Sequence, residues 1–177
     1  MTQDSPRTVV IFPTKNEEDT IEHVIRTARK SHYNPEVIVV DAYSSDRTVK
    51  IANDNGAKVI EQGNRMFPAK AIAMKKGINE AIRYNANIVL FLDADIKNLT
   101  PEWIDKLVDG CSNCDMVRGY YQRHARDAPV TKLIARPMIS VFFPEVSQFE
   151  QPLSGEVCAR TEVWKRLLIQ NPPHGWG

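Results

Sequence analysis

Short, uninterrupted apolar runs alternate with amphipathic stretches along the first two thirds of the chain. Between the runs, apolar residues recur at helical spacing, for example at Ile21, Val24 and Ile25. We therefore expect buried strands at residues 8–12, 37–40, 57–60 and 88–92, a further strand near 116–120, and helices that begin near residues 21, 47, 68 and 101. Such alternation predicts an α/β domain whose open, mainly parallel sheet carries helices on both faces.

The last third of the chain follows a different pattern. Residues 123–129 are polar and predict a loop, and residues 130–143 predict a helix that is interrupted at Pro137. Residues 151–156 predict a turn, which precedes a short helix that Thr161 can cap. The final stretch, 172–177, is rich in glycine and proline, as is typical of the middle of a loop. We expect a fold that is truncated at its C-terminal end.

Composition narrows the class of protein. The 177 residues are 42% hydrophobic and 25% charged, as in soluble globular domains, and the formal net charge is +1. This small charge predicts no electrostatic affinity for nucleic acid or for an anionic membrane. No apolar run approaches the roughly 18 residues of a membrane span, and the N-terminus lacks the order of a signal peptide. With three cysteines and no disulfide framework, we expect a cytoplasmic protein.

Two carboxylates, Asp93 and Asp95, follow directly after the apolar run 88–92. A buried strand cannot hold unpaired charge, so we expect both at its carboxyl end, where open α/β sheets bind ligands. Asp-x-Asp at this edge can hold a hard cation, Mg²⁺ or Mn²⁺, together with the phosphates of a substrate. The simpler interpretation, that both aspartates only cap the next helix, is weaker because Thr100 and Pro101 already supply that cap.

Another carboxylate, Asp41, ends the apolar run 37–40 in the same way. Together with Asp93 and the polar stretches 14–17 and 43–46, it can line one crevice. Asp41 can accept hydrogen bonds from a base or ribose, or it can merely cap its own loop, and both interpretations stay open. The sequence contains no Gly-x-Gly-x-x-Gly and no P-loop motif, which argues against a dinucleotide site or P-loop chemistry. A metal ion is then the natural group to neutralise a diphosphate.

Several other residues have both a functional and a purely structural interpretation. Lys70 and Arg65 can approach a diphosphate, or they can be solvated surface cations. Glu156, which lies in the predicted turn, can act as a base or bind an acceptor, or it can be an ordinary surface carboxylate. Cys111 and Cys114 lack a second pair, so we interpret them as packing residues rather than metal ligands.

Three stretches, in this order, resemble the N-terminal signatures of GT-A fold, family-2-like glycosyltransferases: residues 10–18 (VIFPTKNEE), 39–48 (VVDAYSSDRT) and 91–95 (FLDAD). Three later stretches are similar to the glucosyl-3-phosphoglycerate and mannosyl-3-phosphoglycerate synthases: residues 120–123 (YYQR), 130–137 (VTKLIARP) and 151–156 (QPLSGE). The resemblance covers nearly the whole chain. It implies a GT-A fold in which residues 1–122 form the donor-binding half and residues 123–177 begin an incomplete acceptor-side region.

The resemblance also implies roles for individual residues. Asp95 would be the main metal ligand and a catalytic residue, and Asp93 would be a second ligand that positions the donor. Lys70 would approach the diphosphate or the acceptor and is a further catalytic candidate. Glu156 is also a catalytic candidate, on the ground of its own position in the predicted turn rather than of the resemblance. The donor nucleotide would be bound by Pro13, Thr14 and Glu17, with Ser44 beside them, and the acceptor and sugar by Thr131, Leu153 and Gly155. Asp41 is a candidate for the base or ribose from its place at a strand end, not from the resemblance.

The implied reaction moves a hexose, with retention of configuration, from a UDP- or GDP-hexose to a small acidic acceptor such as 3-phosphoglycerate. The family also tends to form homodimers. This sequence departs from the family at Tyr43, where the family has glycine, and at Ala69 and Ala71, which replace the glycines on either side of Lys70. Pro129 stands where the phosphoglycerate enzymes carry an arginine for the acceptor phosphate.

Other functions remain open from the sequence. One is an inverting family-2 transferase that acts on a polyprenyl phosphate or a polysaccharide, with Glu156 as its base. Another is a non-catalytic domain that binds a nucleotide sugar. A nucleotidyltransferase-like fold is disfavoured because its glycine-rich N-terminal loop is missing.

Overall fold

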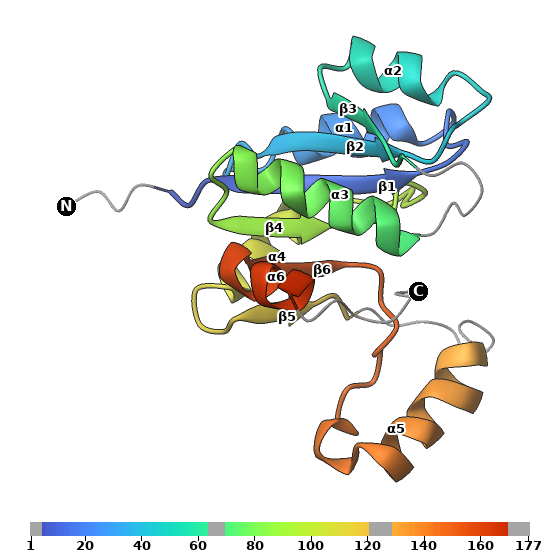
Figure 1. The fold of residues 1–177 in the computed structure, drawn as a ribbon, viewed down its shortest axis with the longest axis vertical. Coiled ribbons are helices and arrows are strands. Elements are labelled where there is room, and N and C mark those ends of the chain that lie inside the picture. The colour runs from blue at the N-terminus through green and yellow to red at the C-terminus, as the bar shows by residue number, and fades with distance from the viewer. Residues whose placement is uncertain (1–4, 64–69, 121–128, 170–177) are drawn as a thin grey trace.

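The structure is a computed structural model that describes residues 5–63, 70–120 and 129–169. Within these residues, one six-stranded sheet has the strand order β3-β2-β1-β4-β6-β5 (Figure 1). Four strands are parallel: β1 (Thr8–Thr14), β2 (Glu36–Asp41), β3 (Lys58–Glu61) and β4 (Ile88–Phe91). The expected parallel sheet is therefore confirmed over its first four strands.

The remaining two strands run the other way. β6 (Val157–Arg160) pairs antiparallel with β4, and β5 (Met116–Arg118) pairs antiparallel with β6. The sequence pattern did not predict β6, because four residues with only three small apolar side chains give too weak a signal. β6 brings the later part of the chain into the sheet formed by the earlier part. The expected boundary near residue 122 lies outside the described residues, and the two-part division stays a prediction.

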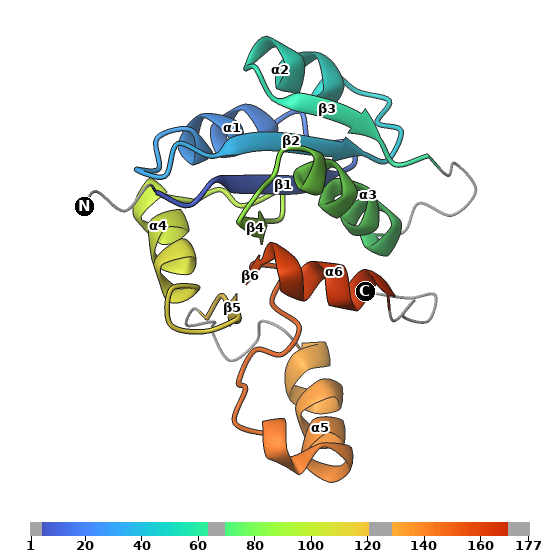
Figure 2. The ribbon, with the colours of Figure 1, turned by 60° about the vertical axis from the view of Figure 1, so that its left-hand side comes forward.

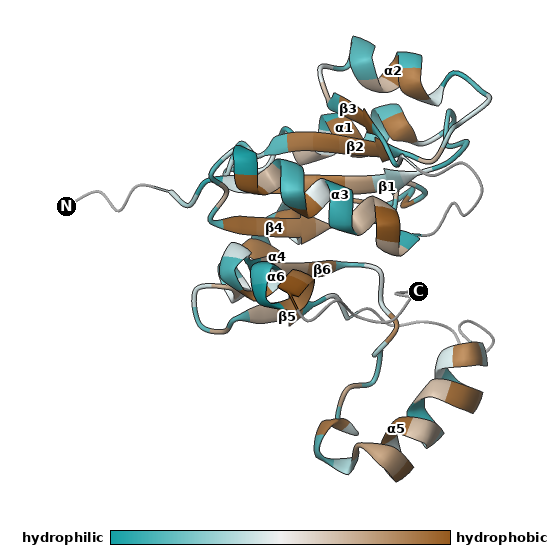
Figure 3. Cartoon of the chain, viewed as in Figure 1, coloured by the Kyte–Doolittle hydropathy of each residue, from teal (hydrophilic) through white to brown (hydrophobic). Residues whose placement is uncertain are grey.

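Helices cover both faces of the sheet, as expected (Figure 2). Alternate side chains of a strand point to opposite faces, so each buried strand contributes to two separate cores. Val10 and Phe12 of β1 pack in the core under α1 (Ile21–Ala28), α2 (Thr48–Asp54) and α4 (Pro101–Gly110). Val9 and Ile11 pack in the core under α3 (Lys70–Arg83) and α6 (Thr161–Ile169). This double covering explains why β4 and the middle of β2, residues 37–40, are uninterrupted apolar runs (Figure 3).

Local signals in the sequence set the helix ends. The Thr100 hydroxyl accepts a hydrogen bond from the Trp103 backbone N–H at 3.3 Å, and Pro101 follows at the first helical position of α4. The cap predicted there is confirmed. Before α2, Asp46 Oδ1 accepts from the Thr48 N–H at 3.0 Å, and after it Gly56 has a φ of +76°.

Residues 130–146 project away from the sheet (Figures 1 and 2). One π-helical turn (Thr131–Ala135) leads into α5 (Arg136–Phe142), and a short 3-10 turn (Pro144–Val146) follows. The expected helix is thus present, and its geometry changes just before Pro137, whose missing N–H breaks the regular bonding pattern. No side chain in these three elements is buried, although Leu133, Val141 and Phe142 are apolar. No helix in the described part of the chain has the length and apolarity that a membrane span requires.

Candidate functional site

The predicted site residues gather at the carboxyl ends of the parallel strands. In the β1–β2 pair, Thr14 lies opposite Asp41 at the last position of both strands. β4 lies on the other side of β1, and the chain reaches Asp93 two residues after β4 ends. β1 is therefore flanked by β2 on one side and by a later strand on the other, which is the topological switch point where such sheets bind ligands.

Two loops at this edge are held together by side chains that bond to backbone. One loop follows β1 and the other follows β2. The Asn16 N–H donates to Ser44 Oγ at 2.9 Å, and Asn16 Oδ1 accepts from the Ser45 N–H at 2.8 Å. The Glu17 N–H donates to Thr48 Oγ1 at 2.8 Å. Asn16 and Thr48 were not singled out from the sequence, because their partners lie about 30 residues away and only the fold brings them together.

Asp41 is buried and serves its own loop. Its Oδ2 accepts from the Ser44 N–H at 3.0 Å, and its Oδ1 accepts from the Ser44 hydroxyl at 2.5 Å. The loop-cap interpretation of Asp41 is thus confirmed, and its contact with a nucleotide stays a prediction. Asp41 and Ser44 also line a cleft of about 650 Å³ together with Lys15, Ala42, Tyr43, Val49 and Glu61.

Asp93 forms an ion pair with Lys70, the first residue of α3. Both side chains are 39% exposed, so the pair borders solvent. The backbone of Gly155 packs against the Asp93 carboxylate, because a Cβ atom placed on Gly155 would lie 2.7 Å from Asp93 Cγ. Three predicted site residues, far apart in sequence, are therefore in contact.

The turn that carries Gly155 is fixed from β5. Arg118 Nη1 donates to the carbonyl oxygens of Pro152 and Ser154 at 2.7 and 2.8 Å. Burial of this guanidinium lowers the pKa of Arg118. The sequence gives no signal for this role of Arg118, because the two carbonyls that it binds are 34 and 36 residues further along.

Glu156 lies inside the fold rather than on the surface. Its side chain is 6% exposed, and Ser154 Oγ donates to its Oε2 at 2.6 Å. Gly119 closes over this carboxylate, since a Cβ there would lie 2.7 Å from Oε2. The interpretation of Glu156 as a surface carboxylate is therefore wrong, and its catalytic role stays a prediction.

Carboxylates near the switch point influence one another. Burial, followed by repulsion from Asp95, raises the pKa of Glu17 above its ordinary value, and Asp46 and Asp93 add to the effect. Asp95 is exposed, and within the described residues its carboxylate makes no hydrogen bond or ion pair. The edge thus concentrates negative charge from Glu17 and Asp95 close to Asp93.

These oxygens fit a hard cation that a substrate helps to hold. Within the described residues, no three His, Cys, Asp or Glu side chains form a metal cage. One or two carboxylates, with the remaining ligands from substrate phosphates, is the usual arrangement for Mg²⁺. Asp93 and Asp95 offer that number and type of ligand.

The other predicted residues lie as follows. Pro13 is half-buried opposite Val40, and the buried Thr14 hydroxyl donates to the Phe12 carbonyl at 2.9 Å. Thr131 begins the projecting segment, and Leu153 is 51% exposed in the turn before Gly155. Arg65 lies outside the described residues, as do Ala69, the stretch 121–128 and the C-terminal stretch 172–177.

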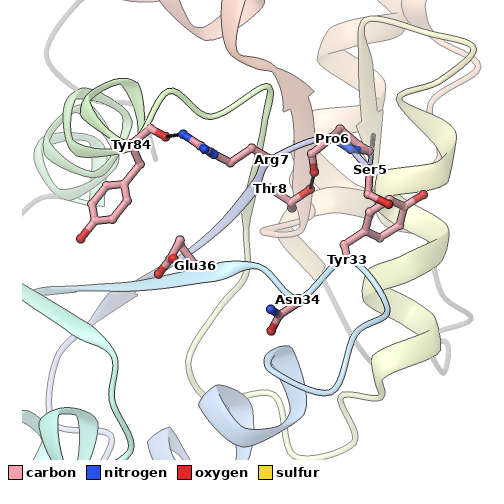
Figure 4. Close-up of a pocket in the computed structure, with 8 residues that line it drawn as sticks. All are labelled: Ser5, Pro6, Arg7, Thr8, Tyr33, Asn34, Glu36 and Tyr84. Atoms are coloured by element: carbon pink, nitrogen blue, oxygen red, sulfur yellow. Dashed lines mark hydrogen bonds between the residues drawn. The ribbon is translucent and has the colours of Figure 1, made fainter. Parts of the chain in front are cut away.

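The opposite edge of the sheet has a separate hollow of about 460 Å³ (Figure 4). It lies at the amino ends of β1 and β2, where Arg7 Nη1 donates to the Tyr84 carbonyl at 2.9 Å and Asn34 lines the wall.

The cysteines differ in their surroundings. Cys111 packs with Cys158, with 3.4 Å between the sulfur atoms, while Cys114 is exposed. The packing interpretation is thus confirmed for Cys111.

Comparison with known proteins agrees with this geometry. The family model described as glycosyl transferase family 2 matches residues 9–145. The chain belongs to glycosyl transferase family 2. The expectation drawn from the three N-terminal signatures is confirmed.

Individual relatives narrow the similarity to particular enzymes within family 2. The glucosyl-3-phosphoglycerate synthase of Petrotoga mobilis is 34% identical over 176 residues, which cover 88% of this chain and 54% of that protein. The mannosylglycerate synthase of Rhodothermus marinus is 30% identical over 172 residues, which cover 88% of this chain and 43% of that protein. The chain thus spans about half the length of the curated relatives that it matches.

A solved structure extends the likeness to three dimensions. The crystal structure of the Mycobacterium tuberculosis glucosyl-3-phosphoglycerate synthase in complex with Mn²⁺, UDP and glucosyl-3-phosphoglycerate superposes with a TM-score of 0.79. It is 30% identical, and the match covers 89% of this chain and 58% of that chain. The GT-A fold expected from the sequence is confirmed.

Proposed function

We propose that this chain provides the donor-binding part of a metal-dependent hexosyltransferase. The reaction would move a hexose from a nucleoside-diphosphate sugar to a hydroxyl group of a small acidic acceptor. One observation carries the proposal: Asp93 and Asp95 follow β4 at the switch point, at the same edge of the sheet as the cleft lined by the interlocked loops after β1 and β2. The relatives named above, one of which was crystallised with Mn²⁺ and UDP, support it.

Asp95 and Asp93 are the proposed ligands of Mg²⁺ or Mn²⁺. The bound cation would act as a Lewis acid that stabilises the diphosphate leaving group. Lys70 would pass from its ion pair with Asp93 to the diphosphate or the acceptor, since its ammonium group borders solvent and can reorient. The proposed contacts to the base and ribose come from Pro13, Thr14, Glu17, Asp41 and Ser44.

The acceptor site is the less complete part of the proposal. We assign Thr131, Leu153 and Gly155 to the acceptor and sugar, and the acceptor class is phosphoglycerate-like because the relatives act on such molecules by name. The arginine that would bind the acceptor phosphate is replaced by Pro129. An acceptor without a phosphate, such as glycerate, is therefore the matched alternative to test.

Retention of configuration is part of the proposal. The inverting alternative needs a base that reaches the acceptor hydroxyl. Glu156 would be that base, but its carboxylate is buried and holds the Ser154 hydroxyl, so the turn would have to move before it could act. The anomeric configuration of the first product, read by NMR, distinguishes the two reactions.

The decisive experiment is a thermal-shift panel with UDP, GDP, ADP and dTDP, each with and without Mn²⁺, on the wild type and on Asp95→Asn. A ligand that binds only the folded protein raises its melting temperature. We expect one nucleotide to stabilise the wild type only in the presence of Mn²⁺, and Asp95→Asn to abolish the shift. Asp54→Asn, which alters an exposed carboxylate on α2 paired with Lys50, should keep it. If Asp95→Asn retains the full shift, the metal assignment is wrong.

A further inference from the structure

Tyr43 has a backbone conformation that is unusual for an aromatic residue. Its φ is +61°, in the left-handed region. The other described non-glycine residues with positive φ are Asn16, Asn34 and Asn85, and asparagine tolerates this region because its short side chain bonds locally. For a bulky side chain the same conformation is strained, and such strain is found mainly where a site requires it.

The surrounding loop fixes this conformation from both sides. The Ala42 N–H donates to the Thr14 carbonyl at 2.8 Å. Ser44 is held by the Asp41 carboxylate and accepts from the Asn16 N–H at 2.9 Å. Glycine would adopt the same backbone without strain. The backbone conformation therefore does not by itself require a tyrosine at this position.

The position of Tyr43 indicates a role for its ring. Tyr43 is half-buried and lines the cleft of about 650 Å³ at the carboxyl end of β2, together with Val49 of α2 and Lys15 of the loop after β1. The loop after β1 contributes Lys15 to this cleft, and β1 is the strand that lies between β2 and β4 at the switch point. A nucleobase is flat and apolar on its faces, and aromatic side chains stack on such faces.

We propose that the Tyr43 ring packs against the face of the donor nucleobase and sets the affinity for the nucleoside part of the donor. This inference rests on the proposed function and goes further by naming a residue, a group of the substrate and a mode of contact. It divides the donor site into two parts: Tyr43, in the cleft, recognises the base, and Asp93 with Asp95, after β4, serves the diphosphate.

Three substitutions separate the ring from the backbone strain. Tyr43→Ala removes the ring and keeps the Cβ atom, Tyr43→Gly removes the ring and relieves the strain, and Tyr43→Phe keeps the ring without the hydroxyl. Asn34→Gly is the matched control, because it relieves a positive φ of +43° at the hollow on the opposite edge (Figure 4). Each protein is examined by isothermal titration with UDP and, separately, with pyrophosphate, both in the presence of Mn²⁺, and by urea denaturation without ligand.

We expect Tyr43→Ala and Tyr43→Gly to bind UDP about tenfold more weakly than the wild type, as the loss of one stacking contact predicts. Their affinity for pyrophosphate should be unchanged, and Tyr43→Phe should bind UDP within about twofold of the wild type. Tyr43→Gly should also unfold at a higher urea concentration than Tyr43→Ala, since only glycine is free of the strain. Asn34→Gly should bind both ligands as the wild type does.

The outcomes are distinct. If Tyr43→Ala binds UDP as tightly as the wild type, or loses pyrophosphate affinity equally, the role of Tyr43 in base recognition is overturned while the proposed function stands. If the wild type, checked as folded by its urea transition, binds none of the four nucleoside diphosphates with Mn²⁺, both the inference and the proposed function are overturned.

Discussion

A methyl group added at Gly155 would press directly on Asp93. In Gly155→Ala, the new carbon would lie 2.7 Å from Asp93 Cγ, whereas ordinary contact begins at 3.4 Å. The turn cannot easily retreat, because Arg118 holds the carbonyl oxygens of Pro152 and Ser154, just before Gly155, at 2.7 and 2.8 Å. We therefore expect the Asp93 carboxylate to be displaced.

Moving Asp93 Cγ out to ordinary contact takes about 0.7 Å, and Asp93 Oδ2, which would lie nearer to the new carbon than Cγ does, has to move further. Both shifts exceed the roughly 0.2 Å tolerance of metal–ligand distances. The substitution should lower the free energy of unfolding by about 1–3 kcal/mol, as overpacking usually does. It should also weaken binding of the nucleotide with Mn²⁺ by about tenfold or more. At a ligand concentration of about 100 times the wild-type Kd, a tenfold loss reduces ligand stabilisation from about 2.7 to about 1.4 kcal/mol.

The assay is urea unfolding with and without UDP and Mn²⁺, compared with Gly110→Ala. A Cβ atom on Gly110 would lie 2.7 Å from Val117 Cγ2, so this control introduces a steric clash of the same kind between α4 and β5, away from the carboxylates. Both variants should lose stability without ligand, and only Gly155→Ala should lose ligand stabilisation. Equal ligand stabilisation in the two variants would refute the argument that Gly155 positions Asp93.

Two further predictions concern Arg118 and Glu17. Arg118→Met should lower the free energy of unfolding by about 1–3 kcal/mol, because the carbonyl oxygens of Pro152 and Ser154 lose a charged donor. Arg118→Lys should recover part of this loss. Urea denaturation measures both variants, and an unchanged midpoint for Arg118→Met would contradict the role of Arg118 in holding the turn. The pKa of Glu17 is raised in the folded protein, so the folded state binds the Glu17 proton more tightly than the unfolded state does. The stability that protonated Glu17 contributes is therefore present below the unfolded-state pKa of 4.5 and is lost as the pH rises through the folded-state pKa. Glu17→Gln should therefore be more stable than the wild type in metal-free buffer at neutral pH and lose that advantage in acid, as urea midpoints across pH would reveal; an advantage that persists in acid would contradict the charge argument.

Part of this protein could be predicted from local signals. The apolar runs of β1, β2 and β4, the helical spacing of α1 and the cap at Thr100 are short-range patterns, and each produced the expected element. Asp93 and Asp95 could be identified as a candidate site because two charges directly after a buried strand must leave the sheet. The family signatures added the GT-A fold, since each is a short stretch of consecutive residues and their order can be read along the chain.

Other features depend on contacts between distant residues. β6 becomes a strand because β4 and β5 bond to it on either side, and its own four residues carry little signal. The burial of Glu156 under Gly119, and the clamp of Arg118 on the turn before Gly155, arise only when β5 and β6 are adjacent. No periodicity in the sequence contains that information.

The sequence by itself therefore determined the layered α/β fold and the chemistry of the carboxylate edge, because both depend on the type and spacing of neighbouring residues. Only the tertiary structure decided that Asp41 serves its own loop, that Lys70 and Gly155 meet at Asp93, and that Tyr43 is held at a positive φ beside a cleft. The physical reason is that hydrogen bonds, ion pairs and steric contacts act over a few ångströms in space, and the fold alone determines which distant residues come within that range.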